Sequence, residues 1–220
     1  MEARSRASGA ESMSVSSRGR LYGGETAEER IAHRRRKLVE AGMNLFGSAD
    51  SGSVRVKDVV AEAGLTERYF YESFSDLEAL FDVAHELTMK ALEEDVEKAL
   101  ANAPAEPVAR ISIAMRTIVD SLVADPRMIR IQFVEALGRG GRAGVRRNEL
   151  YVRSAENYIK WSGPSPGSFM TSPAETRMKA VAVAGAVGEL LISWAEGVLD
   201  LTPAELADFL IGMYWRISLP

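Results

Sequence analysis

The sequence has no cysteine and only two histidines among its 220 residues. The lack of cysteine excludes disulfides, thiolate nucleophiles and cysteine-based zinc sites, and it favours a reducing, cytoplasmic location. The histidines, His33 and His85, show no metal-ligand spacing, and no pair of carboxylates has an obvious acid/base arrangement. We therefore expect no metal site, no cofactor and no catalytic residue.

Long apolar runs are missing as well. The longest, Ala180 to Leu199, is broken by Glu189 and Glu196, which argues against a membrane span. The N-terminus carries arginines but no apolar run, so the sequence predicts no secretory signal. The net charge of -4 counts against coating of nucleic acid through bulk charge, but it permits a local basic face.

The sequence does contain helical periodicity over most of its length. Hydrophobic residues make up 46% and charged residues 26%, so a buried core is expected. Residues 1–24 are rich in Ser, Gly, Ala and Arg and predict a disordered tail. From Glu25, apolar residues recur at three- and four-residue steps, with Thr26 as the expected N-cap and Gly47 as the expected stop.

The rest of the chain also predicts helices and no convincing strand pair. Asp76 is the expected N-cap of a long helix, and Thr202-Pro203-Ala204-Glu205 has the pattern of another helix start. Breaks rich in proline and glycine separate the other helices, which we expect at about Val108–Ala124, Arg127–Leu137, Ala143–Trp161, Ala174–Leu199 and Ala204–Ile217. The predicted fold class is therefore all-α.

The segment VKDVVAEAGLTERYFYESF, Val56 to Phe74, predicts a helix-turn-helix. Gly64 lies where a tight turn between helices requires a positive φ, and Thr66 can cap the second helix with its hydroxyl. On that helix Phe70 and Phe74 are four residues apart and share a buried face. Two further aromatic residues flank this face with their hydroxyls directed outward: Tyr69 and Tyr71.

The segment RKLVEAGMNLFGSADSGSVRVKDVVAEAGLTERYFYESFSDLEALF resembles the N-terminal domain of the TetR (tetracycline repressor-like) family. The resemblance rests on the apolar helix ending in Leu-Phe, the Asp-Val-Val-Ala-Glu-Ala-Gly-Leu segment, the Phe-Tyr-x-x-Phe end of the recognition helix and the following Glu-Ala-Leu-Phe. It covers about Arg34 to Phe81 and is more specific than a bare helix-turn-helix, because it fixes the order and spacing of the elements. The C-terminal helices resemble the dimerisation helices of the family more weakly.

The resemblance implies a homodimeric, DNA-binding transcriptional regulator, usually a repressor, that a small molecule releases from an inverted-repeat operator in double-stranded DNA. It divides the chain into a helix-turn-helix domain, 25–75, and a helical effector-binding and dimerisation domain, 76–220. Carried over by position, Lys57 and Tyr71 match residues that touch phosphates. The residues that match the base-reading stretch are Thr66, Glu67, Arg68 and Tyr69.

Three positions depart from the family pattern. Many members have Lys or Arg where this chain has Leu77, so that phosphate contact is missing. The usual Ser or Thr before the second helix is Arg55, and a commonly small residue is Arg68. We therefore expect affinity to depend on these two arginines, on Lys57 and on the basic run of the first helix, for which a solvated face is the alternative. The candidates in that run are Arg34 and Arg35.

The C-terminal helices carry enough apolar and aromatic surface for a pocket that binds a largely apolar effector. A hydroxyl or carbonyl of that effector could bind a Tyr or Gln132, and Leu87 and Ala91 of the long helix could join the lining. Ordinary core packing is the alternative for each residue. The candidate ligand-binding residues are Met115, Ile118, Phe133, Tyr158 and Trp161.

Small residues in the segment Ala180 to Leu199 would allow two subunits to approach closely, and the last helix adds apolar area for a four-helix interface. Packing within one subunit is the alternative. The candidate interface residues are Gly188, Leu191, Trp194, Phe209 and Met213.

Two enzyme-like matches fail on context. GPSPG, Gly163 to Gly167, fits G-x-S-x-G but follows a helix rather than a strand. GRGGRA, Gly138 to Ala143, fits G-x-G-x-x-A, but no strand leads into it. A helical small-molecule-binding protein or enzyme that keeps the fold without regulating transcription is the alternative to a regulator, and a DNA-binding protein without an effector is a third class.

Overall fold

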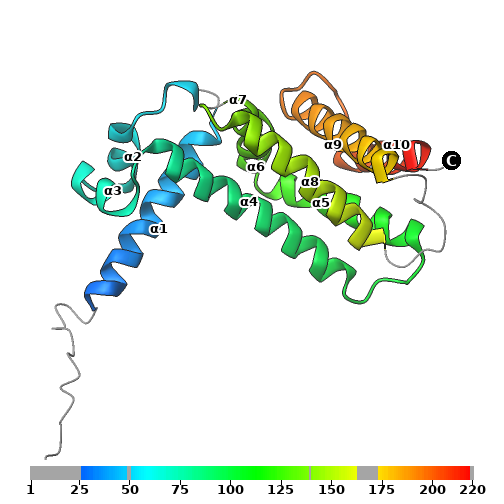
Figure 1. The fold of residues 1–220 in the computed structure, drawn as a ribbon, viewed down its shortest axis with the longest axis horizontal. Helices are drawn as coiled ribbons and strands as arrows, with labels where there is room; N and C mark the ends of the chain where they lie inside the picture. Colours follow the sequence, from blue (N-terminus) through cyan, green and yellow to red (C-terminus); the bar gives the residue numbers. More distant parts are fainter. Residues whose placement is uncertain (1–25, 49–50, 139, 163–172, 219–220) are drawn as a thin grey trace, which may run out of the picture.

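The computed structural model describes residues 26–48, 51–138, 140–162 and 173–218, and these ranges contain helices and no strand. The all-α prediction is confirmed. The predicted tail 1–24 and the GPSPG motif lie outside the described residues. Figure 1 shows three short-to-medium helices at one end, a bundle of helices at the other, and α4 running from one to the other.

The N-terminal unit consists of α1 (Ala27–Phe46), α2 (Val56–Ala63) and α3 (Glu67–Ser73), with a short 3₁₀ turn at Ser51–Ser53. Thr26 caps α1 as predicted, because its hydroxyl accepts from the Glu29 main chain while the Glu29 carboxylate accepts from the main chain of Thr26.

Gly64 lies between α2 and α3 with φ of 63°, which is the left-handed conformation that the turn was expected to require. Thr66 is the N-cap of α3, but its hydroxyl makes no capping hydrogen bond, so that part of the prediction is wrong. Thr66 and Glu67 are both exposed, so the start of α3 faces away from the core.

Helix α4 (Leu77–Leu100) joins the N-terminal unit to the rest of the molecule. Asp76 caps it as predicted, with its carboxylate accepting from the Ala79 main chain at 2.8 Å. Its 24 residues give it a length of about 36 Å. Its first half packs in the core of the N-terminal unit and its second half in a separate core, so one rigid element belongs to both.

The helical body comprises α5 to α10. Its long helices are α5 (Pro107–Ala124), α8 (Ala143–Ser162), α9 (Pro173–Ala195) and α10 (Pro203–Ser218). Helix α10 begins at the predicted Thr202 cap, which pairs with Glu205. Helix α9 ends four residues earlier than expected, because the chain turns at Gly197 with φ of 73°.

The segment predicted as one helix from Arg127 to Leu137 is instead interrupted. A short α6 (Arg127–Ile129) leads into a π-helix, η2 (Arg130–Glu135), which leads into α7 (Ala136–Gly138). Within this segment Ile131 lies in the core of the N-terminal unit and Phe133 in the core of the body. Such π segments occur often at functional sites.

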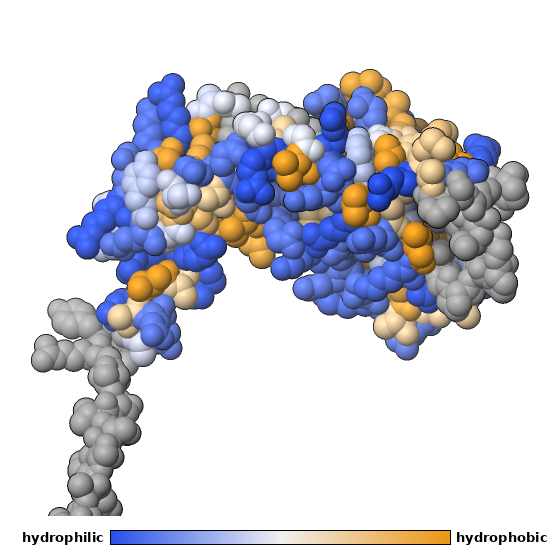
Figure 2. Space-filling view, in the orientation of Figure 1, coloured by the Kyte–Doolittle hydropathy of each residue, from blue (hydrophilic) through white to orange (hydrophobic). Residues whose placement is uncertain are grey.

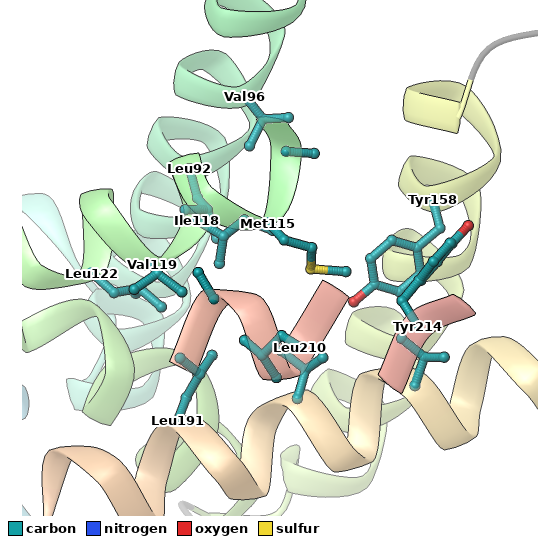
Figure 3. Packing of buried hydrophobic residues seen from close by; sticks show 14 of the residues in the cluster. Leu92, Val96, Met115, Ile118, Val119, Leu122, Tyr158, Leu191, Leu210 and Tyr214 are labelled. Carbon is teal, nitrogen blue, oxygen red and sulfur yellow. The ribbon is translucent and has the colours of Figure 1, made fainter. Parts of the chain in front are cut away.

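The core of the body is apolar and is built from every long helix around it. Figure 3 shows Met115 of α5 extending toward Tyr158 of α8 and Tyr214 of α10, with Leu191 of α9 below. The stretch Arg177–Ala195 within α9 is long and apolar enough to cross a membrane, and 33% of it is buried. One such helix is weak evidence for a span, because core helices of soluble proteins meet the same criterion.

Candidate nucleic-acid interface and effector cavity

The turn presents the N-terminal end of α3 to solvent. Thr66, Glu67 and Arg68 are all exposed, and 84% of the Arg68 side chain is accessible. The opposite face is anchored as predicted by Phe70 and Phe74, which are buried with ring centroids 5.8 Å apart. The predicted base-reading stretch is therefore an outward-facing surface with a buried opposite face, which is the geometry that a recognition helix needs.

The two tyrosines of α3 differ in exposure. Tyr71 is 58% exposed and stands edge-on to the Phe70 ring at 5.3 Å, so its hydroxyl end is free to reach a neighbouring molecule. Tyr69 is only half-buried, because the Arg34 guanidinium covers its ring at 4.4 Å from the centroid.

The candidate arginines of α1 brace α3 instead of extending freely. Arg35 lies 4.3 Å from the centroid of the Phe74 ring and donates to the Ser73 carbonyl at 3.2 Å. Arg34 lies over Tyr69 and comes within 3.9 Å of the Glu72 carboxylate. Both hold the recognition helix against α1, and a contact with phosphate remains a prediction for them.

Glu72 was not predicted as part of this surface. Its carboxylate accepts from Arg68 Nε at 3.0 Å, so it holds the exposed guanidinium along α3. The i, i+4 spacing of Arg68 and Glu72 is the sequence signal for this pair. Because both side chains are substantially exposed, the pair is weak enough for a base edge or a phosphate to replace.

Two further predicted contacts come from α2. Arg55 is exposed at its N-cap and Lys57 is exposed in its first turn. In the part of the chain that the structure describes, neither side chain forms an ion pair. Leu77, which replaces a cation of the family pattern, is half-buried and packs on the core of the N-terminal unit.

A small cavity lies within the body, enclosed by α4, α5, η2, α8 and α9, with a volume of about 50 Å³. Four of the five predicted ligand-binding residues line it: Ile118, Phe133, Tyr158 and Trp161. Met115 is buried in the adjoining core but is not part of the wall. Leu87 and Ala91 are exposed, so the prediction that they line the pocket is wrong; Met89 and Leu92 take that place on α4.

The polar groups of the wall are unevenly satisfied. Among the described residues of the wall, only Glu93 is charged, and its carboxylate accepts from Arg153 and Asn157 at 2.5 to 2.7 Å. Burial opposes ionisation, but these hydrogen bonds outweigh it and lower the pKa of Glu93. Among the described residues, Gln132 Nε2 and Trp161 Nε1 have no hydrogen-bond partner.

Tyr158 adds a third potential donor to the wall. Burial, with a smaller contribution from Tyr214, raises the pKa of its phenol. The phenol therefore stays protonated at physiological pH and can donate a hydrogen bond.

Three larger hollows, of about 340, 690 and 810 Å³, open to solvent around α9. The two largest are lined by the loop before α10 and by the start of α9, respectively. They are wide surface depressions, whereas a pocket that buries most of a ligand must enclose it. The small cavity is therefore the better match to the predicted effector pocket, although at about 50 Å³ it would have to widen to accept a ligand.

Two arginines connect the N-terminal unit to the body. Arg146 of α8 is 2% exposed and contacts Glu78 and Asp82 of α4 at 2.8 to 2.9 Å, with its guanidinium 4.7 Å from the Phe81 ring centroid. The sequence signal for it is that Arg146 falls in helical register with Leu150 on the buried face of α8. A cation in that register needs buried or half-buried acids opposite it.

The second connection is Arg127 of α6. It pairs with Asp125 at 2.8 Å, with Glu40 of α1 at 2.7 Å, and also donates to Asn44. The side-chain hydrogen bond with Arg127 is the main reason that the pKa of Asp125 is lowered. The π segment η2 follows α6 directly, so this connection lies beside the cavity wall.

The predicted dimer residues do not share one surface. Leu191 is fully buried in the core, and Gly188 is buried so closely that an added Cβ would lie 2.9 Å from Phe133 Cδ1. Neither can contact a second subunit without rearrangement, so both are corrected to internal positions. Phe209 is 51% exposed, while Trp194 and Met213 are half-buried. Figure 2 shows hydrophobic residues on the end of the molecule that carries α9 and α10.

The arrangement of a three-helix N-terminal unit on a helical body is the fold of TetR-family transcriptional regulators. The chain resembles a TetR-like regulator from Rhodococcus sp. RHA1, with a TM-score of 0.62, 16% identity, and coverage of 84% of this chain and 95% of that one. It also resembles the fatty acid degradation regulator FadR from Bacillus halodurans, with a TM-score of 0.67, 13% identity, and coverage of 83% of this chain and 94% of that one. A TetR-family regulator from Streptomyces coelicolor matches with a TM-score of 0.65, 14% identity, and coverage of 84% of this chain and 80% of that one. No protein-family model and no curated protein matches the sequence.

Proposed function

We propose that the protein is a homodimeric, sequence-specific DNA-binding transcriptional repressor of the TetR family that acts in the cytoplasm and is released from its operator by a small apolar ligand. The observation that carries this proposal is the rigid, exposed start of α3. It combines an αL glycine turn, an exposed Arg68, and anchoring of the opposite face by buried aromatic rings. A side chain needed only for packing would not be displayed in this way.

The charges around α3 suit a duplex. Arg68 can donate two guanidinium N–H groups to guanine, one to O6 and one to N7, and Tyr69 offers an apolar face to a thymine methyl. Lys57, Arg55 and Tyr71 lie on the exposed surface where phosphates would pass. The net charge of -4 is no obstacle, because binding depends on where the exposed cations lie, and Arg55, Lys57 and Arg68 are all exposed in the N-terminal unit.

Two elements, η2 and α4, contribute residues both to the cavity wall and to the core of the N-terminal unit. Gln132 and Phe133 line the cavity, and Ile131, their neighbour in the π-helix, packs in the core of the N-terminal unit. On the other side, α4 contributes Leu92 to the cavity wall and Leu80 to the N-terminal core. The cavity is also enclosed by α5, α8 and α9, but η2 and α4 are the elements of its wall that extend into the N-terminal core. We therefore expect a ligand that displaces η2 or α4 to change the position of α3.

The energetic requirement for release is considerable. A ligand must favour the DNA-incompetent arrangement about 10⁴-fold, or by about 5.5 kcal/mol, to convert a mostly bound repressor into a mostly free one. The closed state of the cavity, at about 50 Å³, supplies the needed asymmetry: a ligand of useful size fits only the widened state. By reciprocity, operator DNA weakens ligand binding by the same factor.

Selection of bound sequences from a random DNA pool tests the DNA-binding part of the proposal. Enriched sequences should contain an inverted repeat with half-sites about 34–36 Å apart or somewhat more. Arg68→Ala should relax base preference at one position of each half-site and cost about 1–3 kcal/mol.

Lys57→Ala is the matched comparison, because it removes one exposed cation without touching α3. It should weaken binding to all sequences alike and reduce the slope of log affinity against log salt concentration by about one. If both variants bind DNA with wild-type affinity, Arg68 does not read a base and Lys57 does not contact a phosphate. Absence of any enriched sequence would favour the alternative, a ligand-binding protein or enzyme that keeps the fold.

A further inference from the structure

We propose that the effector is an uncharged, largely apolar molecule that carries a carbonyl or an equivalent hydrogen-bond acceptor, which Gln132 and Trp161 recognise. This inference deepens the proposed function, because it assigns a chemical class to the ligand of the same cavity.

Two residues of the wall each carry a buried nitrogen donor without a partner. Gln132 is 1% exposed and Trp161 is 5% exposed, and the amide nitrogen of one and the indole nitrogen of the other lack a partner among the described residues. A buried polar group without a partner costs free energy, and most are satisfied in folded proteins. An indole nitrogen can only donate, so the missing partner is an acceptor.

The charge of the wall argues for a neutral ligand. Its only charged residue, Glu93, already pairs with Arg153 and Asn157. Among the residues that the structure describes, no cation lines the cavity to neutralise a ligand carboxylate, which would lie close to the Glu93 carboxylate. A buried charge without a counter-ion is strongly disfavoured, whereas a carbonyl gains a hydrogen bond without this cost.

The remainder of the wall is apolar and aromatic, with Leu92, Ile118, Phe133, Leu150 and Val187 among its members. These side chains favour a hydrocarbon or aromatic body for the ligand. One acceptor on such a body satisfies one or both donors of the wall.

The test uses three compounds of similar size: acetophenone, its hydrocarbon counterpart ethylbenzene, and the anion benzoate. Binding to the full-length protein is measured by calorimetry at millimolar concentrations. Acetophenone should bind at least about tenfold more tightly than ethylbenzene, which is the difference expected for one satisfied buried donor. Benzoate should bind more weakly than either.

The variants Gln132→Met and Trp161→Phe remove one donor each while preserving most of the side-chain volume. Each should weaken acetophenone binding relative to ethylbenzene binding about three- to tenfold, a ratio that cancels the effect of the changed volume of the wall. Trp215→Phe is the matched control, because the Trp215 indole nitrogen is also buried without a partner but does not line the cavity. It should leave the affinity for both compounds unchanged.

The proposal is overturned if benzoate binds most tightly, if ethylbenzene binds as well as acetophenone, if both donor variants bind acetophenone as the wild type does, or if none of the three compounds binds. None of these measurements contains DNA. If the protein binds acetophenone but selects no DNA sequence, the proposed function is refuted and the ligand class stands. If benzoate alone releases operator DNA, the proposed function stands and the ligand class is refuted.

Discussion

Replacing the buried Arg146 by Met should destabilise the protein far more than removal of an exposed ion pair. Arg146 is 2% exposed and contacts two carboxylates, whose side chains are 35% and 30% exposed. Removing one partner of a fully buried ion pair costs about 3–5 kcal/mol. Because water reaches both acids and Arg142 remains 3.4 Å from Asp82, we expect a smaller loss of about 2–3 kcal/mol in the free energy of unfolding.

Arg116→Met is the matched control. Arg116 also pairs with an acid of another helix, Asp208, but these side chains are 50% and 64% exposed. Its loss should cost at most about 1 kcal/mol. Urea unfolding, followed by helical circular dichroism at one protein concentration, measures both variants. Equal losses in the two variants, or a loss below about 1 kcal/mol for Arg146→Met, would refute the assignment of Arg146 as the buried connection between α4 and α8.

Three further outcomes follow from the geometry. Burial, assisted by a neighbouring arginine, lowers the pKa of His85 from 6.5 to about 4. The free energy of unfolding should therefore fall by about 3 kcal/mol as the pH drops from 6.5 to about 4, because the unfolded chain binds the proton first. In His85→Gln this part of the pH dependence should be absent. Gly188→Ala should destabilise by about 1 kcal/mol, because its new Cβ overpacks an aromatic ring, whereas Gly212→Ala, with open space around it, should stabilise by up to about 1 kcal/mol in thermal unfolding. Glu72→Gln should raise DNA affinity in fluorescence anisotropy, because it releases Arg68; unchanged affinity would mean that their pairing does not compete with DNA.

Much of the N-terminal unit could be predicted from the sequence, because local signals determine it. The αL turn at Gly64, the Asp76 cap, and the buried face formed by Phe70 and Phe74 all follow from spacing and side-chain chemistry. The cap by the Thr66 hydroxyl was wrong, since an N-cap residue can adopt the required backbone without using its side chain.

The body was harder to predict, because long-range packing decides it. The apolar run from Arg127 to Leu137 indicated one regular helix, whereas Arg130–Glu135 form a π-helix whose Ile131 and Phe133 lie in different cores. Likewise, small size suggested an interface role for Gly188, although its closest neighbour is Phe133 of the same subunit. Periodicity identifies a buried face without identifying its partner.

The most direct test of the central claim is the affinity of the protein for its own selected DNA, measured with and without acetophenone by fluorescence anisotropy. The account predicts tight, sequence-specific binding in the absence of the compound and weaker binding as its concentration rises. In Ala184→Val, whose added methyl groups fill a cavity of about 50 Å³, DNA binding should persist and the response to the compound should disappear. A protein that selects no DNA sequence, or an Ala184→Val variant that responds like the wild type, would contradict the account.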